Sequence, residues 1–351
     1  MNTAQRRYRH TDLVRWASSC FRVAGAAGED ADETARVLVR TNLRGIDTHG
    51  VSRIPGYVEK MLAGEVNVAP KPRSEFRNGV VLFDGDGGLG QSVAMQAVRE
   101  SVARAADQAA VTCFIRGSGH LAALGQFVLE AAEQGLVAML CQETPPLMAL
   151  EGSSRPSIGN NPIAFAFPVA GDAPGVFDMA SSVVARGNLL QAISDERESI
   201  PGHWAIGPDG RPTEDPKAAL QGAMLPIAGH KGVGLAMMVQ ILAGSLTGSL
   251  TAASASKHGA SSSAGNVSAF LLVLNPDLLA GRQAYDAHVR HWLDSYLAAS
   301  GEGSRFPGQR AAECEADRLR TGIPVPESTV KALSKLGASL GVAFDLPQIV
   351  R

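Results

Sequence analysis

From Val80 onward, short apolar runs alternate with stretches of helical periodicity, and no other feature constrains the fold as strongly. The runs VVLFD, VTCFI and LVAML are typical of strands, and SVAMQAVRESVARAADQA and LAALGQFVLEAAEQ between them repeat apolar residues at helical spacing. PIAFAFP, VFDMA and AFLLVLNP are further strand candidates. Strands that alternate with helices are typical of an α/β domain, so we predict an α/β fold class.

Both ends of the chain are expected to be helical instead. The spacing of apolar residues predicts helices before residue 65 and again over about Leu278–Ala298 and over Glu327–Leu340, and the Pro-rich segment 66–78 is interpreted as a linker. We therefore predict an N-terminal helical part, 1–75, an α/β part, 76–277, and a C-terminal helical part, 278–351. The two terminal parts are expected to pack together.

Three local patterns lead to more specific expectations. Asp30 and Glu33 have the spacing of a capping box at the start of a helix. The stretch Leu235–Leu246, LAMMVQILAGSL, is the most apolar of the chain and predicts a buried helix. The low-complexity stretch Ser254–Ser263 predicts a mobile loop.

Composition excludes several classes of function. Lysine and arginine total 32 against 34 acidic residues, so the basic surplus of a nucleic-acid-binding protein is missing. The four cysteines lie far apart without a CxxC pair, which indicates neither a zinc site nor a disulfide framework. No metal is expected. The most apolar stretch is shorter than the roughly 20 residues that span a bilayer, and no signal peptide is evident, so we predict a cytoplasmic protein without a membrane partner.

The segment Gly85–Gly90, GDGGLG, has the glycine spacing of the Rossmann dinucleotide-binding motif. That motif also requires an acidic residue at the end of the second strand. Here the second strand ends in Ile115, Arg116 and Gly117, with no acid. The mismatch favours a glycine turn over a Rossmann site.

Candidate catalytic residues occur in two segments. His49, Arg53 and Tyr57 are spaced four apart, so Arg53 and Tyr57 would share a helical face, and Arg53 could bind a carboxylate at the start of that helix. The alternative is a helix-capping turn with a surface arginine. His120 follows a strand after the small residues Ser118 and Gly119, which leaves room for a ligand beside a group that exchanges protons. The alternative is a histidine that caps the next helix.

Candidate binding residues lie in three loops. Asn161 lies in a polar turn before an apolar strand, and Asp178–Ser181 follows another strand; ordinary turns would explain both. Lys231 stands between glycines at the start of a helix, where the helix dipole disfavours a cation unless an anion is bound. A Schiff-base lyase that uses Lys231 is a further alternative.

Together and in this order, the motifs resemble the malate/L-lactate dehydrogenase family of NAD(P)-dependent oxidoreductases, over about residues 13–342. The carriers are LRGIDTHGVSRIPGY, GLGQ, GSGHLAALG, GNNPIAFAFP, DMASSVVARG, HWAIGPDGRPTEDPKAAL, GHKGVGLAMMVQILAG, PGQ at Pro307 and GIPVP at Gly322. The resemblance implies a family-specific, non-Rossmann nucleotide-binding domain, a helical domain built from both chain ends, and a homodimer.

The resemblance also implies roles for individual residues. One or both of His49 and His120 would carry the proton, while Arg53 and Tyr57 face the substrate. The position of His120 after a strand and two small residues favours it as the direct donor, with His49 as its partner or alternative. The residues expected to contact NAD or NADP are Thr144, Asn161, Asp178, Met179, Ala180, Ser181, His230, Lys231, Pro307 and Gly308.

The implied activity is hydride transfer between nicotinamide and a small 2-hydroxy or 2-oxo carboxylic acid. Reduction of a cyclic 2-imino acid is the alternative substrate reading, and a non-catalytic binding protein is a remote one. The sequence departs from the family pattern at Ala122, where glycine is usual, and at Gln240, where glutamate is usual.

Overall fold

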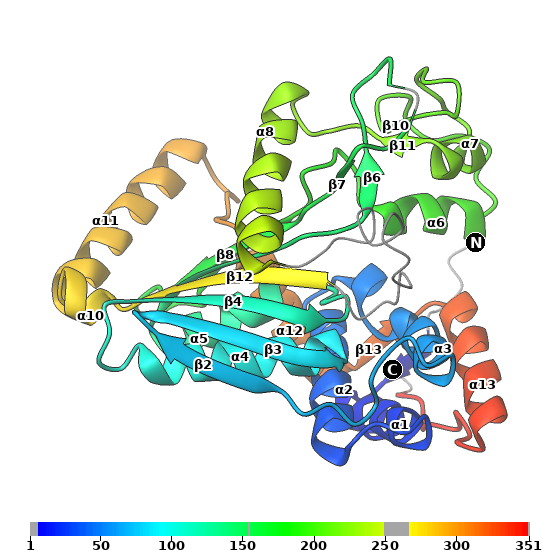
Figure 1. Ribbon diagram of the computed structural model, residues 1–351, viewed down its shortest axis with the longest axis horizontal. Helices are drawn as coiled ribbons and strands as arrows, with labels where there is room; N and C mark the ends of the chain where they lie inside the picture. Colours follow the sequence, from blue (N-terminus) through cyan, green and yellow to red (C-terminus); the bar gives the residue numbers. More distant parts are fainter. Residues whose placement is uncertain (1–5, 154, 249–266, 350–351) are drawn as a thin grey trace.

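In a computed structural model, which describes residues 6–153, 155–248 and 267–349, a seven-stranded mixed sheet forms the centre of the molecule (Figure 1). Only β3 and β4 are parallel neighbours in it, and every other neighbouring pair is antiparallel. This topology differs from the parallel Rossmann sheet and confirms the non-Rossmann α/β prediction. The strands, in spatial order, are β2 (Arg73–Arg77), β3 (Val80–Gly88), β4 (Ala110–Ser118), β12 (Val267–Leu274), β5 (Val137–Gln142), β8 (Ile163–Phe167) and β9 (Gly175–Met179).

Helices cover the two faces of this sheet unequally. α4 (Gly90–Arg104) and α5 (Gly125–Glu133) pack beneath it, and α8 (His230–Val239), continued by the π-helical turn η3 (Gln240–Gly244), stands on the other face (Figure 1). The main core lies between the sheet and α4 and α5, because alternate strand residues such as Val81, Ile115 and Leu140 point to that side.

Segments from both ends of the chain form a second core beside the sheet (Figure 1). β1 (Arg6–Tyr8) pairs antiparallel with β13 (Ile323–Val325), so residues more than 300 positions apart are neighbours. The helices that contribute to this core are α1 (His10–Val23), α2 (Gly28–Leu43), α3 (Ile54–Leu62) and α13 (Glu327–Leu340), and α12 (Gln309–Thr321) packs on α2. The three-part division at residues 75 and 277 stays a prediction.

The remaining elements lie at two edges. A four-stranded sheet has the order β10 (Ala205–Ile206), β11 (Ala223–Met224), β6 (Pro146–Met148), β7 (Ile158–Gly159) and carries α6 (Arg186–Ser194) and α7 (Pro216–Gln221) beside it (Figure 1). α10 (Pro276–Leu279) leads into α11 (Arg282–Ser300), which packs its Val289 and Leu293 against Val169, next to β8.

The expected linker 66–78 is only partly a linker, because residues 73–77 form the edge strand β2. All five of its residues are exposed, and Arg73, Glu75 and Arg77 place charges along the free edge. Asn78 and Gly79, both at positive φ, close the hairpin to β3. The charged composition, which suggested a linker, is also how proteins protect an edge strand.

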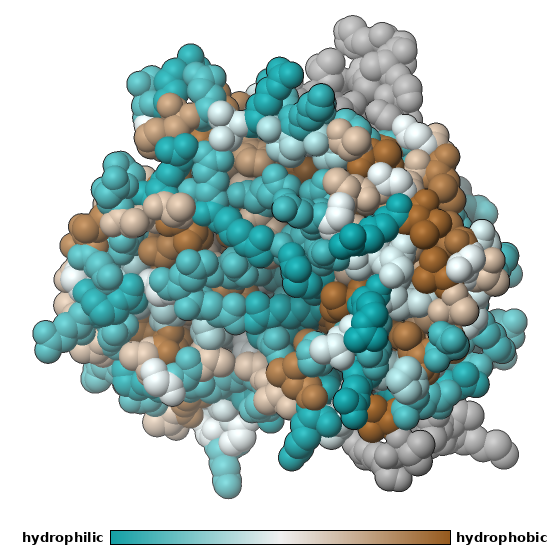
Figure 2. Space-filling view, turned by 90° about the horizontal axis from the view of Figure 1, so that it is seen from below, coloured by the Kyte–Doolittle hydropathy of each residue, from teal (hydrophilic) through white to brown (hydrophobic). Residues whose placement is uncertain are grey.

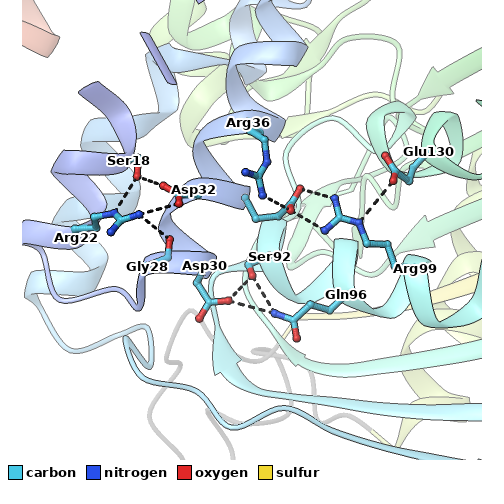
Figure 3. A network of polar contacts seen from close by, with 11 residues as sticks. Ser18, Arg22, Gly28, Asp30, Asp32, Arg36, Ser92, Gln96, Arg99 and Glu130 are labelled. Atoms are coloured by element: carbon cyan, nitrogen blue, oxygen red, sulfur yellow. Dashed lines mark hydrogen bonds and ion pairs between the residues drawn. The ribbon is translucent and has the colours of Figure 1, made fainter. Parts of the chain in front are cut away.

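The expected capping box at Asp30 and Glu33 is wrong. The N-cap of α2 is Ala27, and it makes no side-chain cap hydrogen bond. Asp30 accepts a hydrogen bond from Ser92 on α4, and the buried carboxylate of Glu33 is bound by Arg99 on the same helix (Figure 3). Both acids therefore hold α2 against α4 instead of capping α2.

The expectation that Leu235–Leu246 is buried is also wrong. Val239 and Ala243 face the sheet, but an apolar row on the opposite side of α8 and η3 is open to solvent. The face of the molecule that carries α1, α2, α4 and α5 is, in contrast, largely hydrophilic (Figure 2). The exposed side chains of the row, named here the α8 apolar row, are Leu235, Met237, Met238 and Ile241.

The stretch 254–263, expected to be a mobile loop, lies outside the described residues. Among the helices of the described ranges, none is both long and apolar enough to cross a membrane. All four cysteines are free thiols, and burial raises the pKa of Cys20, Cys113 and Cys141 to about 12.

Candidate active site

Tyr57 and His120 meet at the junction between the helical core and the central sheet. Tyr57 lies on α3, and His120 lies in the loop after β4, as predicted. The phenol oxygen of Tyr57 is 2.9 Å from Nδ1 of His120, and the two rings are stacked at 27°. Tyr57 is 8% exposed, and burial raises the pKa of its hydroxyl, so the phenol keeps its proton. His120 does not cap α5, which begins five residues later.

Two glutamines hold the loop that carries His120. Gln91 Nε2 donates to the carbonyl of His120 at 2.9 Å, and Gln142 contacts the loop on both sides, accepting from Leu121 N and donating to Gly119 O, both at 3.4 Å. Gly90 lets α4 approach this loop, since a Cβ there would lie 2.5 Å from the carbonyl oxygen of His120. Gly90 therefore allows close packing against the loop of His120, whereas the other glycines of the Gly85–Gly90 segment lie within β3 instead of forming a turn after it.

His49 and Arg53 approach the same place from short 3-10 turns rather than from the start of a helix. η1 (Asp47–His49) and η2 (Val51–Arg53) precede α3. The rings of His49 and His120 are 6.4 Å apart between centroids, and His49 Nδ1 is 2.9 Å from the hydroxyl of Thr48. Arg53 Nε donates to Thr48 O at 2.7 Å, which leaves its two terminal nitrogens for a ligand. The four predicted catalytic residues are thus neighbours.

The electrostatic surroundings keep both histidines neutral. Burial, followed by the charge of Arg53, lowers the pKa of His49 to about 4. Burial lowers the pKa of His120 to about 3, and His49, Arg53 and Lys60 add to the effect. A neutral imidazole beside an arginine is ready to accept a proton, and an anion bound to Arg53 would raise both pKa values.

The backbone conformation of Ala122 explains why glycine is usual at this position, two residues after His120. Its φ is +69°, a left-handed conformation that costs a residue with a Cβ about 1–2 kcal/mol. Ala122 is nevertheless buried in the helical core, so its methyl group is packed. The strain lies in the loop that positions His120.

Three of the predicted cofactor residues form one buried network instead of an open surface. Asn161 is fully buried and accepts through Oδ1 from the backbone N–H of Thr144 at 2.9 Å, while its amide donates to Ala236 on α8. Ser181 Oγ donates to Asn161 O at 2.9 Å. This network fixes the ends of β5, β8 and β9 against α8. Thr144, Asn161 and Ser181 therefore shape the site through the backbone.

A buried carboxyl group joins that network. Gln240, whose carbonyl oxygen lies 3.3 Å from the amide of Asn161, donates through its own amide to Glu143, and Ser268 also donates to Glu143 at 3.0 Å. Burial raises the pKa of Glu143. The close approach is possible because Gly244 has no side chain: a Cβ there would lie 2.7 Å from Glu143 Oε2. The π-helical turn η3 places both Gln240 and Gly244 beside Glu143.

The start of α8 has the composition and space of a phosphate site. Gly229 is the N-cap and offers no side-chain cap, and a Cβ at Gly229 or Gly234 would meet nothing within 4 Å. His230 and Lys231 are exposed in the first turn. Free backbone N–H groups, an unpaired lysine and open glycines suit the pyrophosphate of a dinucleotide, so this segment fits a nicotinamide cofactor.

The other predicted cofactor residues are distributed along β9. Asp178 Oδ2 accepts from the backbone N–H of Gly125 at 2.8 Å, so this carboxyl caps α5, and burial raises its pKa to about 6. Met179 and Ala180 follow it toward Ser181. Pro307 and Gly308 contact the opposite end of β9, where Val176 N donates to Pro307 O at 2.9 Å. The structure thus brings Ser181 to the start of α8 and leaves Pro307 at the far end of the strand.

Several residues of the site were not assigned from the sequence. In the sequence, Gln142 is an ordinary residue at the end of an expected strand, and Gln91 is part of the GLGQ motif but has no assigned role. Gly187, in the first turn of α6, lies beside Arg53: a Cβ at Gly187 would lie 2.9 Å from Arg53 Nη2. The available signal was its place in the motif DMASSVVARG.

Comparisons with known proteins give the same answer as the motifs. A family model described as malate/L-lactate dehydrogenase matches residues 8–334. The chain is 34% identical over 327 residues to a (2R)-3-sulfolactate dehydrogenase (NADP(+)) of Chromohalobacter salexigens, which covers 92% of this chain and 96% of that protein. It is 35% identical over 330 residues to a Delta(1)-pyrroline-2-carboxylate/Delta(1)-piperideine-2-carboxylate reductase of Pseudomonas syringae pv. tomato, which covers 93% of this chain and 94% of that protein.

The solved structures agree with the relatives in sequence. The malate dehydrogenase of Pyrococcus horikoshii OT3 superposes with a TM-score of 0.85 at 28% identity and covers 97% of this chain and 97% of that chain. Nearly the whole chain is therefore accounted for by one family. The chain belongs to the malate/L-lactate dehydrogenase family.

Proposed function

We propose that the protein is an NAD(P)-dependent oxidoreductase that interconverts a small 2-oxo acid and its 2-hydroxy acid. The observation that carries this proposal is the convergence of Tyr57, His120, His49 and Arg53. The two histidines lie beside the guanidinium of Arg53. The terminal nitrogens of that guanidinium have no carboxylate partner among the described residues. That combination fits a substrate with a carboxylate next to a carbonyl.

Arg53 would hold the substrate carboxylate, because its planar guanidinium matches two carboxylate oxygens. The Thr48 carbonyl fixes its Nε, so the terminal nitrogens have a defined direction. Binding of the anion removes one of the charges that lower the pKa of His120. Substrate binding therefore makes His120 a better proton donor than it is in the free protein.

In the oxidative direction, neutral His120 accepts the proton of the C2 hydroxyl; in the reductive direction, protonated His120 returns it to the carbonyl oxygen. Tyr57 keeps its own proton, and its phenol oxygen accepts a hydrogen bond from Nδ1–H of His120, so the lone pair of Nε2 faces the substrate hydroxyl. His49 lies close enough to relay the proton or to orient the acid. When bound, nicotinamide supplies or takes up the two electrons and the hydrogen at C2.

Lys231 and the free N–H groups of α8 would hold the cofactor phosphates. Asp178, Met179, Ala180 and Ser181, together with Pro307 and Gly308, are proposed to line the cofactor site from β9. Lys231 is exposed, whereas a Schiff-base lysine requires a buried amine, so the start of α8 suits phosphate binding better than lyase chemistry.

Reduction of a cyclic imino acid is the second candidate. The 35% identity to a pyrroline- and piperideine-carboxylate reductase favours it. The same Arg53 would hold the carboxylate, and His120 would protonate nitrogen instead of oxygen.

A second copy of the chain is the proposed partner. The α8 apolar row exposes four large side chains, and two of them, Met237 and Ile241, are more than half exposed. Such a patch is typical of a protein–protein interface. The expected state is a cytoplasmic homodimer. Light scattering would give the mass of a dimer, and Met237→Glu with Ile241→Glu would reduce it to that of a monomer.

One experiment tests the activity directly. NADH and NADPH oxidation would be measured in parallel against pyruvate, oxaloacetate and a cyclic imino acid. We expect turnover with at least one 2-oxo acid and its loss in His120→Ala. Absence of turnover with every acid and both cofactors would contradict the proposed function.

A further inference from the structure

At Gly187, the backbone of α6 comes close to three residues of the candidate site. A Cβ on Gly187 would lie 2.9 Å from Nη2 of Arg53, 3.6 Å from Cβ of Thr48 and 3.9 Å from Cε1 of His49. Gly187 is buried, although its two neighbours along α6 are exposed. Of the three contacts, only the one with Arg53 is too short for a side chain, so the guanidinium packs directly on the helix backbone.

The backbone of α6 does not itself require glycine at this position. Gly187 lies in the first turn of the helix, and its φ is not in the left-handed region that favours glycine. Alanine favours a helix more than glycine does, so glycine here is unfavourable for α6 alone. The advantage of Gly187 is therefore its missing side chain, which leaves the space that the guanidinium of Arg53 occupies.

α6 is held in place on another side, whereas the end of the Arg53 side chain can move. α6 buries Leu189 and Ala192 in a core that it shares with β10 and β11 of the four-stranded sheet. Arg53 is held by the hydrogen bond from its Nε to Thr48 O at 2.7 Å, and Nη2 lies beyond that bond at the end of the side chain. A methyl group at position 187 would therefore displace the guanidinium and leave α6 where it is.

We propose that Gly187 is a positioning residue for the substrate carboxylate. Its missing side chain lets the guanidinium of Arg53 lie on α6, in the place from which it binds the carboxylate next to the reacting carbon. The inference rests on the proposed function, in which Arg53 holds that carboxylate. It adds α6 to the hydrogen bond with Thr48 as a second contact that fixes the position of Arg53.

The test is Gly187→Ala, with Gly56→Ala as the matched control. Gly56 also lies in the first turn of a helix, α3, and it precedes Tyr57, but a Cβ there would meet nothing within 4 Å. The methyl group at position 187 would have to displace Nη2 by about 0.5 Å to reach an ordinary contact of about 3.5 Å. A misplacement of about 1 Å can cost roughly a hundredfold in rate, so we expect about a tenfold effect here.

The effect should appear in the binding of the acid and not in that of the cofactor. We expect KM to rise about tenfold in Gly187→Ala for whichever of pyruvate, oxaloacetate and piperideine-2-carboxylate the wild type reduces best. The affinity for NADH or NADPH should be unchanged, and the melting temperature should not fall, because alanine suits the helix. Gly56→Ala should behave as the wild type in KM and in cofactor affinity.

Combination with Arg53→Lys shows whether the effect passes through Arg53. Lysine is shorter than arginine and has no Nη2, so the methyl group at position 187 has nothing to displace. We expect Gly187→Ala to leave the already raised KM of Arg53→Lys unchanged. Losses that multiply would mean that the methyl group acts on the substrate or on α6 by another route, and they would overturn the inference.

Crystal structures of the two alanine variants test the inference without turnover. The guanidinium of Arg53 should be displaced in Gly187→Ala and unmoved in Gly56→Ala. An unmoved guanidinium or an unchanged KM in Gly187→Ala would overturn the inference. Failure of that variant to fold would also overturn it, since rigid backbone rather than Arg53 would then meet the methyl group. Absence of turnover in the wild type would contradict the proposed function, and the position of Arg53 would still decide whether Gly187 places it.

Discussion

The hydroxyl of Tyr57 lies 2.9 Å from Nδ1 of His120, although 63 residues separate the two in the chain. Tyr57 belongs to the helical core made from both chain ends, and His120 lies in the loop that follows β4 of the sheet. The contact therefore links the helical core to the sheet, and any shift between these two parts changes the surroundings of His120.

Tyr57→Phe tests whether this contact matters for catalysis. A buried phenylalanine keeps the packing, so the loss is the hydrogen bond, worth about 1 kcal/mol or roughly a factor of five to ten in rate. We expect kcat to fall by that factor and the pH profile to move, while the KM for the cofactor is unchanged. An unaltered kcat and profile would show that Tyr57 only packs.

The pH dependence of hydroxy-acid oxidation reports on the histidines. An unperturbed histidine would give a limb in kcat/KM near pH 6.5. Because burial lowers the pKa of His120 to about 3 and that of His49 to about 4, the free protein keeps neutral bases well below that value. We expect kcat/KM to stay level from pH 8 to below pH 6 and to fall only at more acidic pH.

The two histidine variants separate the roles. His120→Ala should drop kcat by about a hundredfold or more and remove the acidic limb while the cofactor still binds. His49→Ala should act mainly on KM. Loss of the limb in His49→Ala and its retention in His120→Ala would exchange the two assignments.

Arg53→Lys should impair turnover although it keeps the charge. Lysine cannot offer two parallel N–H groups to a carboxylate and loses the hydrogen bond to Thr48. We expect KM for the acid to rise at least about tenfold. Arg197→Lys, at an exposed ion pair, is the control and should behave as the wild type. Equal loss with a carbonyl analogue that lacks the carboxylate would assign Arg53 another task.

Lys231→Ala should weaken NADH or NADPH binding at least about tenfold, as expected for a charge-assisted contact with phosphate. Lys217→Ala removes another exposed lysine from the first turn of a helix and serves as the control. Fluorescence titration of the reduced cofactor measures both. Equal affinities in the two variants would remove Lys231 from the cofactor site.

Ala122→Gly should stabilise the protein by about 1 kcal/mol, because relief of the left-handed strain outweighs the greater entropy of the unfolded chain. Ala63→Gly, at an exposed helix end with φ −78°, should destabilise it slightly. Urea unfolding followed by circular dichroism compares the two. A loss of stability in Ala122→Gly would mean that the methyl packing exceeds the strain.

The elements that were found from the sequence have strong local patterns. β3, β4, β5, β8, β9 and β12 are apolar runs of strand length, and α13 was predicted with its observed ends. α12 was missed because none of its residues is buried, so its polar surface gives no clear apolar stripe. β2 was missed for a related reason, since its five residues are all exposed.

The residues of the candidate site also differ in whether a local sequence pattern indicates them. Arg53 and Tyr57 were found because four-residue spacing on a helix is a local signal. Gln142 and Gly187 were missed because their positions depend on how distant segments pack. The exposure of the α8 apolar row was not predicted, because a run of apolar residues does not indicate whether its side chains are buried by the same chain or by another molecule.

The position of β12 also determines when this protein can fold. β12 lies between β4 and β5, and both neighbours pair with it, yet it is formed by residues 267–274. Until a ribosome has released that segment, the nascent sheet consists of two halves with unpaired edges facing each other. Such edges favour intermolecular pairing, and strand pairing across more than 100 residues is slow. A chain that ends before residue 267 therefore leaves the facing edges of β4 and β5 without the strand that joins them.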